Sequence, residues 1–282
     1  MLFVGCQTGG MVTHFWQIPP PGTRAVQIGI DPGDLGRNYS KAVPILGDAK
    51  VALRMLLEAV QPAQALGPWA HEARKLAADW RAEVEPLRSS DAVPMRPERI
   101  LKELGDWLPA DALVVCDTGH SAMWAAQQLW VNGAGWDFIR CAGHLGWAFP
   151  AALGAKCAAP ERPVVCFTGD SGFWYHLQEL KTAVRCGINT VTIVNNNNSL
   201  NQEIGPFTRV YDGKPSGNWG DMWHFTKVNL AKVAESTGAL GIRVEKPSEL
   251  RSALDRALSS NQPAVVDVQS DMEALAPTAW VG

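Results

Sequence analysis

The sequence predicts an α/β fold built on a parallel sheet. Two short apolar runs, 164–167 and 190–194, have the length and composition of buried strands. Between them, apolar residues recur at helical spacing from Phe173 until Gly187, and glycine is a common residue at helix ends. A strand, a helix and a second strand in this order form one βαβ unit. Such a unit brings the carboxyl ends of both strands to the same edge of the sheet.

Polar residues follow each of these two strands. The segment 169–172, Gly-Asp-Ser-Gly, comes after the first strand, and four asparagines, 195–198, come after the second. A carboxylate, a carboxamide and a free backbone carbonyl are hard oxygen ligands that suit Mg²⁺ or Ca²⁺. Because a single carboxylate carries little charge, phosphate oxygens are expected to complete such a metal site, and a helix start with Gly and Ser favours a phosphate. The alternative is an ordinary turn followed by an ordinary loop.

This pattern resembles the thiamine diphosphate motif of enzymes similar to acetolactate synthase and benzoylformate decarboxylase, in which Gly-Asp-Gly is followed, one helix and one strand later, by Asn-Asn. The family spacing from the Asp to the second Asn falls on Asn197. The resemblance implies Mg²⁺ ligands from the Asp170 carboxylate, the Asn197 side-chain oxygen and the Ser199 backbone carbonyl, completed by diphosphate and water. The family usually has Gly where this chain has Ser171, so it departs from the pattern there.

A second segment, 143–156, resembles the family stretch in which a bulky apolar residue supports the bent V shape of the cofactor. Leu145 takes that place, at the family spacing before Asp170. The resemblance also implies that the backbone at Gly143 receives the aminopyrimidine ring. His144, beside the supporting leucine, is a candidate local acid or base, and a packed or solvent-facing histidine is the alternative.

A third segment, 117–126, follows the predicted strand 113–116 and is similar to the family loop that lies against the diphosphate. His120 and Ser121 occupy the two positions that usually carry polar donors, although a turn histidine without a ligand is the alternative for His120. Together the resemblances imply cofactor contacts from Thr118, Gly119, His120, Ser121, Gly143, Leu145, Gly169, Ser171, Gly172, Leu200 and Gln202.

The predicted organisation has three parts. Residues 1–61 resemble the second half of the family's central domain, residues 62–95 are predicted to be a linker, and residues 96–282 the thiamine diphosphate (PP) binding domain. The expected fold is therefore a three-layer parallel-sheet diphosphate-binding domain preceded by half of a Rossmann-like central domain. Half a domain cannot cover both faces of a parallel sheet, so something else must complete it. FAD, which some relatives bind in this domain, stays undecided.

The family's pyrimidine-binding domain, which carries the Glu that activates the cofactor, has no counterpart before Met1. We therefore expect the diphosphate- and Mg²⁺-binding subunit of a heteromeric α2β2 enzyme. Its partner would carry the pyrimidine domain, the activating Glu and the first half of the central domain. The resemblance implies a decarboxylase, carboligase or 2-hydroxyacyl lyase acting on a 2-oxo acid or acyloin. Pro206 stands where acetolactate synthases carry a Trp, which argues against simple acetolactate synthesis. The alternative is a non-catalytic regulatory or scaffolding subunit.

Composition excludes several classes of function. With 25 Lys and Arg against 28 Asp and Glu, the net charge of −3 gives no electrostatic case for nucleic acid or an anionic membrane. We find neither an apolar run of transmembrane length nor a signal-peptide pattern, so we expect a cytoplasmic location. The six cysteines have no Cys-x-x-Cys spacing and are expected to be buried and reduced. No Gly-x-Gly-x-x-Gly follows a predicted strand, so a nicotinamide-dependent enzyme has little support.

Overall fold

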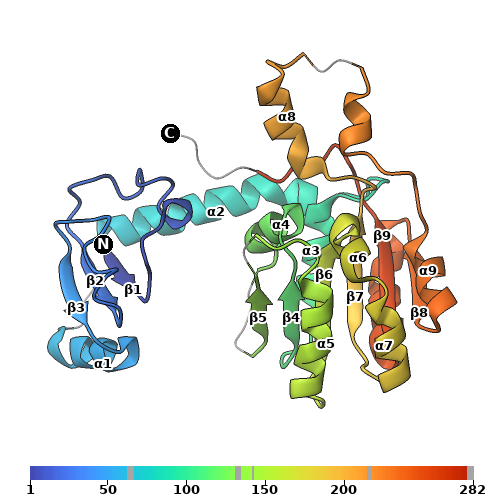
Figure 1. The fold of residues 1–282 in the computed structure, drawn as a ribbon, viewed down its shortest axis with the longest axis horizontal. Helices are drawn as coiled ribbons and strands as arrows, with labels where there is room; N and C mark the ends of the chain where they lie inside the picture. The colour runs from blue at the N-terminus through green and yellow to red at the C-terminus, as the bar shows by residue number, and fades with distance from the viewer. Residues whose placement is uncertain (62–66, 131–134, 142, 215–216, 278–282) are drawn as a thin grey trace. The chain divides into compact units, whose positions relative to one another are not determined.

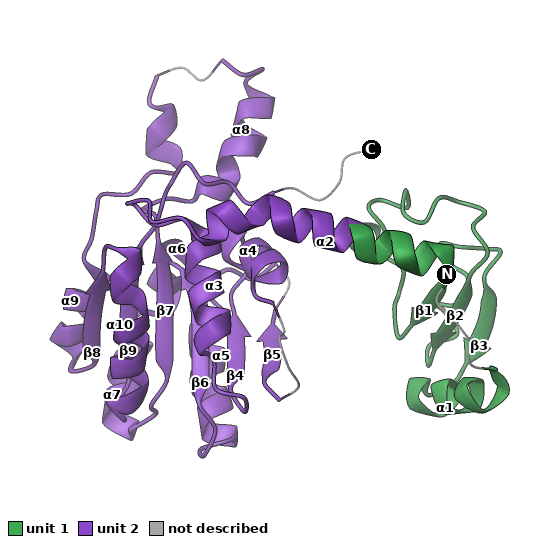
Figure 2. Cartoon of the chain, turned by 180° about the vertical axis from the view of Figure 1, so that it is seen from behind, with its two compact units in different colours: residues 1–75 green, residues 76–282 purple. Residues whose placement is uncertain are grey.

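The computed structural model describes residues 1–61, 67–130, 135–141, 143–214 and 217–277. The chain divides into two compact units, residues 1–75 and 76–282, and the boundary lies within helix α2 (Pro68–Arg88), as Figure 2 shows. The predicted boundaries at 61 and 95 stay a prediction, and the first five residues of the predicted linker, 62–66, lie outside the described residues. In both units the paired strands are parallel, so the predicted α/β class is confirmed.

Unit 1 contains a small parallel sheet with the strand order β1 (Leu2–Val4), β2 (Val26–Gly29), β3 (Val43–Leu46). It also contains a short 3₁₀ helix, η1 (Gly10–Val12), and helix α1 (Ala49–Ala59). Asp48 caps α1, because its Oδ1 accepts a hydrogen bond of 3.0 Å from the Val51 amide. No residue of α1 is buried, and Val43, Leu46 and Leu57 are exposed. Much apolar surface of this unit therefore stays uncovered.

Unit 2 contains a six-stranded parallel sheet with the strand order β5-β4-β6-β7-β9-β8. The strands are β4 (Leu113–Cys116), β5 (Asp137–Arg140), β6 (Val164–Gly169), β7 (Val191–Asn196), β8 (Leu240–Val244) and β9 (Ala264–Gln269). The predicted βαβ unit is confirmed, because β6 and β7 are parallel neighbours with Gly169 opposite Asn195. Sequence reasoning missed β5, whose four residues are all exposed at the sheet edge and so give no buried apolar signal.

Helices cover both faces of this sheet and make three layers (Figures 1 and 2). On one face lie α3 (Pro97–Trp107), α4 (His120–Gln128) and α10 (Pro247–Ser259); on the other lie α5 (Ala148–Ala158), α6 (Asp170–His176), α7 (Glu179–Cys186) and α9 (Leu230–Thr237). Each face has its own buried cluster, with Leu101 and Ile193 in one and Phe149 and Phe173 in the other. The helix expected to start at Phe173 starts earlier and is divided in two, although Gly187 ends it as predicted.

An excursion leaves the sheet between β7 and α9. It contains η2 (Asn201–Glu203), α8 (Ile204–Val210) and η3 (Trp219–Met222), and it projects beyond the sheet edge in Figure 1. The Trp219 ring packs edge-on against the rings of Phe207, Tyr211 and Trp223, at centroid distances of 6.1, 6.4 and 5.9 Å. The excursion is therefore held together by its own aromatic cluster.

Two expectations from composition can be compared with the structure. All six cysteines are free, but only Cys116 and Cys166 are buried, while Cys157 and Cys186 are exposed. The expectation that the thiols are buried is therefore wrong for the two exposed residues. Within the described ranges, no helix is both long and apolar enough to cross a membrane.

Candidate cofactor and metal site

A cavity lies where β4, β6 and β7 of unit 2 end. Strands β5 and β6 flank β4 in the sheet, and the chain passes from β4 to β5 on one side of β4 and then to β6 on the other side. Ligands of open α/β sheets bind at such a reversal of strand order. Every predicted metal ligand and every predicted cofactor contact lines this cavity, together with Asn195, Asn201 and Glu203. His144 is not among the lining residues: it is exposed, with Nδ1 3.3 Å from the Leu145 carbonyl oxygen.

The three predicted metal ligands lie together in the cavity. The Ser199 amide donates to Asp170 Oδ2 at 3.2 Å and to Asn197 Oδ1 at 3.1 Å. One N–H therefore brings a carboxylate oxygen and a carboxamide oxygen to the same point. The Ser199 carbonyl oxygen accepts from Ser171 Oγ at 3.2 Å, which fixes its direction. Each of these oxygens keeps a lone pair for another partner.

The Asp170 carboxylate lies in an environment that disfavours its charge. Burial raises the pKa of Asp170 to about 7, although amide donors such as those of Ser171 and Ser199 lower it. Among the described residues, no Lys or Arg forms an ion pair with it. A cation bound beside Asp170 would therefore relieve an unfavourable buried charge.

The donor set narrows the choice of metal. Within the described part of the chain, no group of three or more His, Cys, Asp and Glu side chains could hold a metal ion. The oxygens beside Asp170 come from one carboxylate, one carboxamide and one backbone carbonyl, which suits a hard ion such as Mg²⁺ rather than zinc. Such a metal needs further oxygen ligands, because these three do not fill an octahedral shell.

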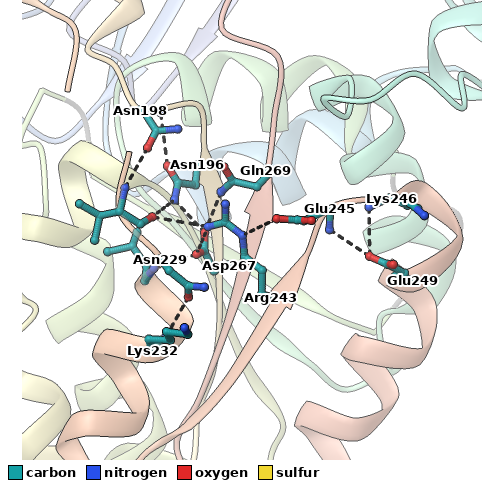
Figure 3. Close-up of polar contacts among 12 residues, drawn as sticks. Asn196, Asn198, Asn229, Lys232, Arg243, Glu245, Lys246, Glu249, Asp267 and Gln269 are labelled. Carbon is teal, nitrogen blue, oxygen red and sulfur yellow. Dashed lines mark hydrogen bonds and ion pairs between the residues drawn. The ribbon is translucent and has the colours of Figure 1, made fainter. Parts of the chain in front are cut away.

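Asn195 and Asn197 line the cavity, whereas the side chains of Asn196 and Asn198 have other partners, which Figure 3 shows. Asn196 Nδ2 donates to Asp267 Oδ1 at 2.8 Å and to the Val228 carbonyl at 3.3 Å, and Asn198 Oδ1 accepts from the Val228 amide at 3.4 Å. Both side chains are thus engaged with residues at or just before α9, and neither lines the cavity. Of the two asparagines that line the cavity, only Asn197 shares the Ser199 amide with Asp170.

A buried hydrogen-bond network around Asp267 supports the turn formed by the asparagine run 195–198. The Asp267 carboxylate is fully buried, and its Oδ2 accepts from Arg243 Nη1 at 2.6 Å and from the Leu230 amide at 2.8 Å (Figure 3). Its other oxygen accepts from Asn196, so one carboxylate joins β7, β8, β9 and the start of α9. Through Asn196, the position of the following residue, Asn197, is tied to the centre of the sheet.

A second buried carboxylate holds the loop that carries Leu145. Asp117, at the end of β4, accepts from the Gly146 amide at 3.1 and 3.0 Å and from Thr168 Oγ1 at 2.8 Å. A Cβ added at Gly172 would lie 2.2 Å from Asp117 Oδ2, so only glycine fits there. The order Ser171–Gly172 therefore has a steric reason. Sequence reasoning missed Asp117, since its partners come from distant segments.

Asn195 was not among the predicted site residues, and neither were the cavity residues Asn201 and Glu203. Asn195 is 5% exposed, it lines the cavity, and its Oδ1 has no hydrogen-bond partner among the described residues; the buried Ser199 Oγ has none either. Buried polar atoms without partners are rare, and here they lie beside an open cavity. The donor chemistry of the site thus fits a polar ligand. The signal available in the sequence was the place of Asn195 directly after the predicted strand 190–194.

The region that contains this site is similar to a known protein family. Residues 117–268, more than half of the chain, match the family model described as "Thiamine pyrophosphate enzyme, C-terminal TPP binding domain". The chain belongs to this family. The predicted resemblance is therefore confirmed, and the site described above lies inside the matched thiamine pyrophosphate (TPP) binding domain.

Individual relatives of this TPP-binding chain are longer proteins. It is 33% identical over 286 residues to the acetolactate synthase large subunit of Haemophilus influenzae, covering 96% of this chain and 47% of the relative. It is 31% identical over 261 residues to the putative thiamine pyrophosphate-containing protein YdaP of Bacillus subtilis, covering 92% and 44%. It is 30% identical over 268 residues to the acetolactate synthase isozyme 3 large subunit of Escherichia coli, covering 89% of this chain and 44% of the relative. The chain thus spans slightly less than half of each of these relatives.

Proposed function

We propose that this chain is the diphosphate- and Mg²⁺-binding subunit of a heteromeric, cytoplasmic, thiamine diphosphate-dependent lyase or transferase. The enzyme makes or breaks a C–C bond next to a carbonyl, as a decarboxylase, carboligase or 2-hydroxyacyl lyase. The observation that carries the proposal is the convergence of Asp170 Oδ2 and Asn197 Oδ1 on the Ser199 amide. Similarity to acetolactate synthase large subunits supports the reaction class, and the substrate is a 2-oxo acid or an acyloin.

The residues of the cavity divide the work of holding the cofactor. Asp170, Asn197 and the Ser199 carbonyl hold Mg²⁺, and His120 and Ser121, at the start of α4, lie where the diphosphate binds. Thiamine diphosphate supplies a nucleophilic carbon that adds to the substrate carbonyl. The tasks of this chain are to neutralise the diphosphate, to orient the rings and to limit their movement. FAD stays outside the proposal.

We assign the activating Glu to a partner chain that carries the pyrimidine domain and the first half of the central domain, in an α2β2 complex. Support comes from unit 1, where Val4, Val43 and Leu46 of the sheet are exposed and α1 buries no residue. An apolar surface of this kind is typical of a protein interface. Co-expression with the product of the neighbouring reading frame tests this assignment. Full activity of the monodisperse chain alone contradicts it.

Titration with thiamine diphosphate and Mg²⁺ separates an enzyme subunit from the non-catalytic alternative. Trp147 lies two residues from Leu145 and Trp174 four residues from Asp170, so tryptophan fluorescence should report binding. We expect saturable quenching that needs both components and is reversed by EDTA. A scaffold that keeps only the fold gives no saturable change.

A Leu145→Ala variant should distinguish how the organic part and the diphosphate part of the cofactor contribute to binding. Leu145 Cδ1 lies 3.8 Å from the position of a Cβ at Gly119, so the leucine lies beside the loop that carries Gly119. In the proposal, Leu145 contacts the organic part of the ligand. Loss of this apolar contact should cost about 1–3 kcal/mol, which is roughly a 5- to 150-fold weaker Kd for Mg²⁺·thiamine diphosphate. The Kd for Mg²⁺·pyrophosphate should not change.

The conservative variant Leu145→Met is the control, because it keeps the side-chain volume and should bind both ligands as the parent chain does. Equal weakening of thiamine diphosphate and pyrophosphate by Leu145→Ala would indicate a collapsed loop instead of a lost ring contact.

Mg²⁺-dependent cofactor binding should weaken in acid. The metal needs the ionised Asp170 carboxylate, whose pKa is raised to about 7 by burial, so protons compete with Mg²⁺ below that pH. The Mg²⁺ concentration for half-maximal binding should rise by about tenfold per pH unit below roughly pH 6.5 and level off above about pH 8. Fluorescence titrations across this range measure it. A flat profile contradicts the assignment of Asp170 as a ligand.

A further inference from the structure

Asn201 makes three hydrogen bonds that fix the orientation of its carboxamide. Its Nδ2 donates to the backbone carbonyls of Met272 at 3.2 Å and Ala274 at 3.3 Å, and its Oδ1 lies 2.8 Å from His120 Nδ1. Two carbonyl oxygens accept hydrogen bonds only, so the NH₂ group must face them. The oxygen of Asn201 therefore faces His120.

The orientation of Asn201 determines the tautomer of His120. A carboxamide oxygen only accepts, so His120 Nδ1 must carry the hydrogen in this contact. In the neutral ring, Nε2 then has a lone pair and no hydrogen. Nε2 makes no hydrogen bond within the described residues, and His120 lines the cavity. Neutral His120 therefore offers the cavity an acceptor, which an anionic diphosphate oxygen cannot use.

The surroundings of His120 keep the free ring neutral. Burial lowers its pKa below the ordinary value, and the hydrogen bond to Asn201 offsets only part of this. The carboxyl groups that line the same cavity are Asp170 of α6 and Glu203 of η2. The charged groups of the elements around α4 are engaged elsewhere: Arg99 with Glu103, Lys102 with Asp106, Asp271 with Arg96, and Asp117 with Thr168.

We propose that His120 takes up one proton at Nε2 when the diphosphate binds, and that Asn201 is the positioning residue that directs this proton toward the cavity. The proton comes from solvent and forms a new N–H bond, and the imidazolium then donates to a phosphate oxygen. The charge-assisted hydrogen bond stabilises the protonated ring. The inference rests on the proposed function and deepens it, because it makes cofactor affinity depend on a proton as well as on Mg²⁺.

Calorimetry of the intact chain tests the proposal. Mg²⁺·thiamine diphosphate is titrated at about pH 8 in buffers of different ionisation enthalpy, which gives the number of protons taken up per ligand bound. The matched control is His120→Gln, whose side-chain NH₂ is a donor without a titration. Asp170 titrates in both proteins, so the difference isolates His120. We expect the parent chain to take up close to one proton more than the variant. The ratio of the parent chain's Kd to the Kd of His120→Gln should grow by roughly tenfold per pH unit above neutrality.

Asn201→Asp is the second variant. A carboxylate facing Nδ1 stabilises the imidazolium before the ligand arrives, so the uptake of protons should fall toward that of His120→Gln. Mg²⁺·pyrophosphate should reproduce the parent's uptake, which locates the proton at the diphosphate. Equal proton uptake in the parent chain and His120→Gln overturns the inference. Uptake that occurs with Mg²⁺·thiamine diphosphate but not with Mg²⁺·pyrophosphate overturns it as well. If the parent chain binds no Mg²⁺·thiamine diphosphate at any pH, the proposed function fails and this inference fails with it.

Discussion

An Asp170→Asn variant is expected to weaken binding of Mg²⁺·thiamine diphosphate by more than about 100-fold, because removing a supporting contact of a metal ligand already costs 10- to 100-fold. The carboxamide has the shape of the carboxylate, but its NH₂ group cannot accept, so it keeps only one of the two amide contacts of Asp170, those with Ser171 and Ser199. The variant also removes the only negative charge among the three candidate Mg²⁺ ligands. The measurement is fluorescence titration with Mg²⁺ and cofactor together.

The control for this variant is Asp111→Asn. Asp111 is exposed, and its carboxylate makes no hydrogen bond or ion pair among the described residues. Its replacement removes the same charge from the chain and should leave the Kd unchanged. If Asp170→Asn binds as tightly as the control, Asp170 does not ligate the metal.

An Asp267→Ala variant is expected to lower the free energy of unfolding by about 3–5 kcal/mol, the usual cost of removing one partner of a buried ion pair. The variant leaves Arg243, one fourth exposed at 24%, without its closest carboxylate, and it leaves the buried Leu230 amide without an acceptor. Asn196 also loses its 2.8 Å partner, so the asparagine turn loosens. Urea unfolding measures the stability.

Glu245→Ala gives the comparison for this variant. Glu245 is 64% exposed and lies 3.4 Å from Nε of the same arginine, so its pair with Arg243 is worth less than about 1 kcal/mol. A large loss for Asp267→Ala with a small loss for Glu245→Ala is the expected result. Similar losses for both would mean that the buried network contributes little to the free energy of unfolding.

Local patterns predicted much of this fold. The apolar run 164–167 lies within β6, and the run 190–194 coincides with β7 from Val191 onward. Both polar ends meet at one sheet edge because parallel neighbours end together. The spacing that selected Asn197 agrees with the structure in one respect, since Asn197 is the asparagine that shares an amide with Asp170. Its role as a ligand stays a prediction.

Other features depend on residues that are far apart in the chain. Asp267 reaches Asn196 across 71 positions, and Asp117 reaches Gly146 across 29, and no periodicity in the sequence reports such contacts. The break between α6 and α7 falls at Leu177 and Gln178, both of which favour helix, so propensity gives no sign of it. Tertiary packing decided these points.

The Ser199 amide has a consequence for how fast and how tightly a cation can be captured. One N–H restrains a carboxylate and a carboxamide from different strand ends, so the oxygens already stand near each other in the ligand-free protein. The entropy of gathering them is lost during folding and not again at association. Capture should then be limited by how quickly the ion sheds water, with little rearrangement of the polypeptide.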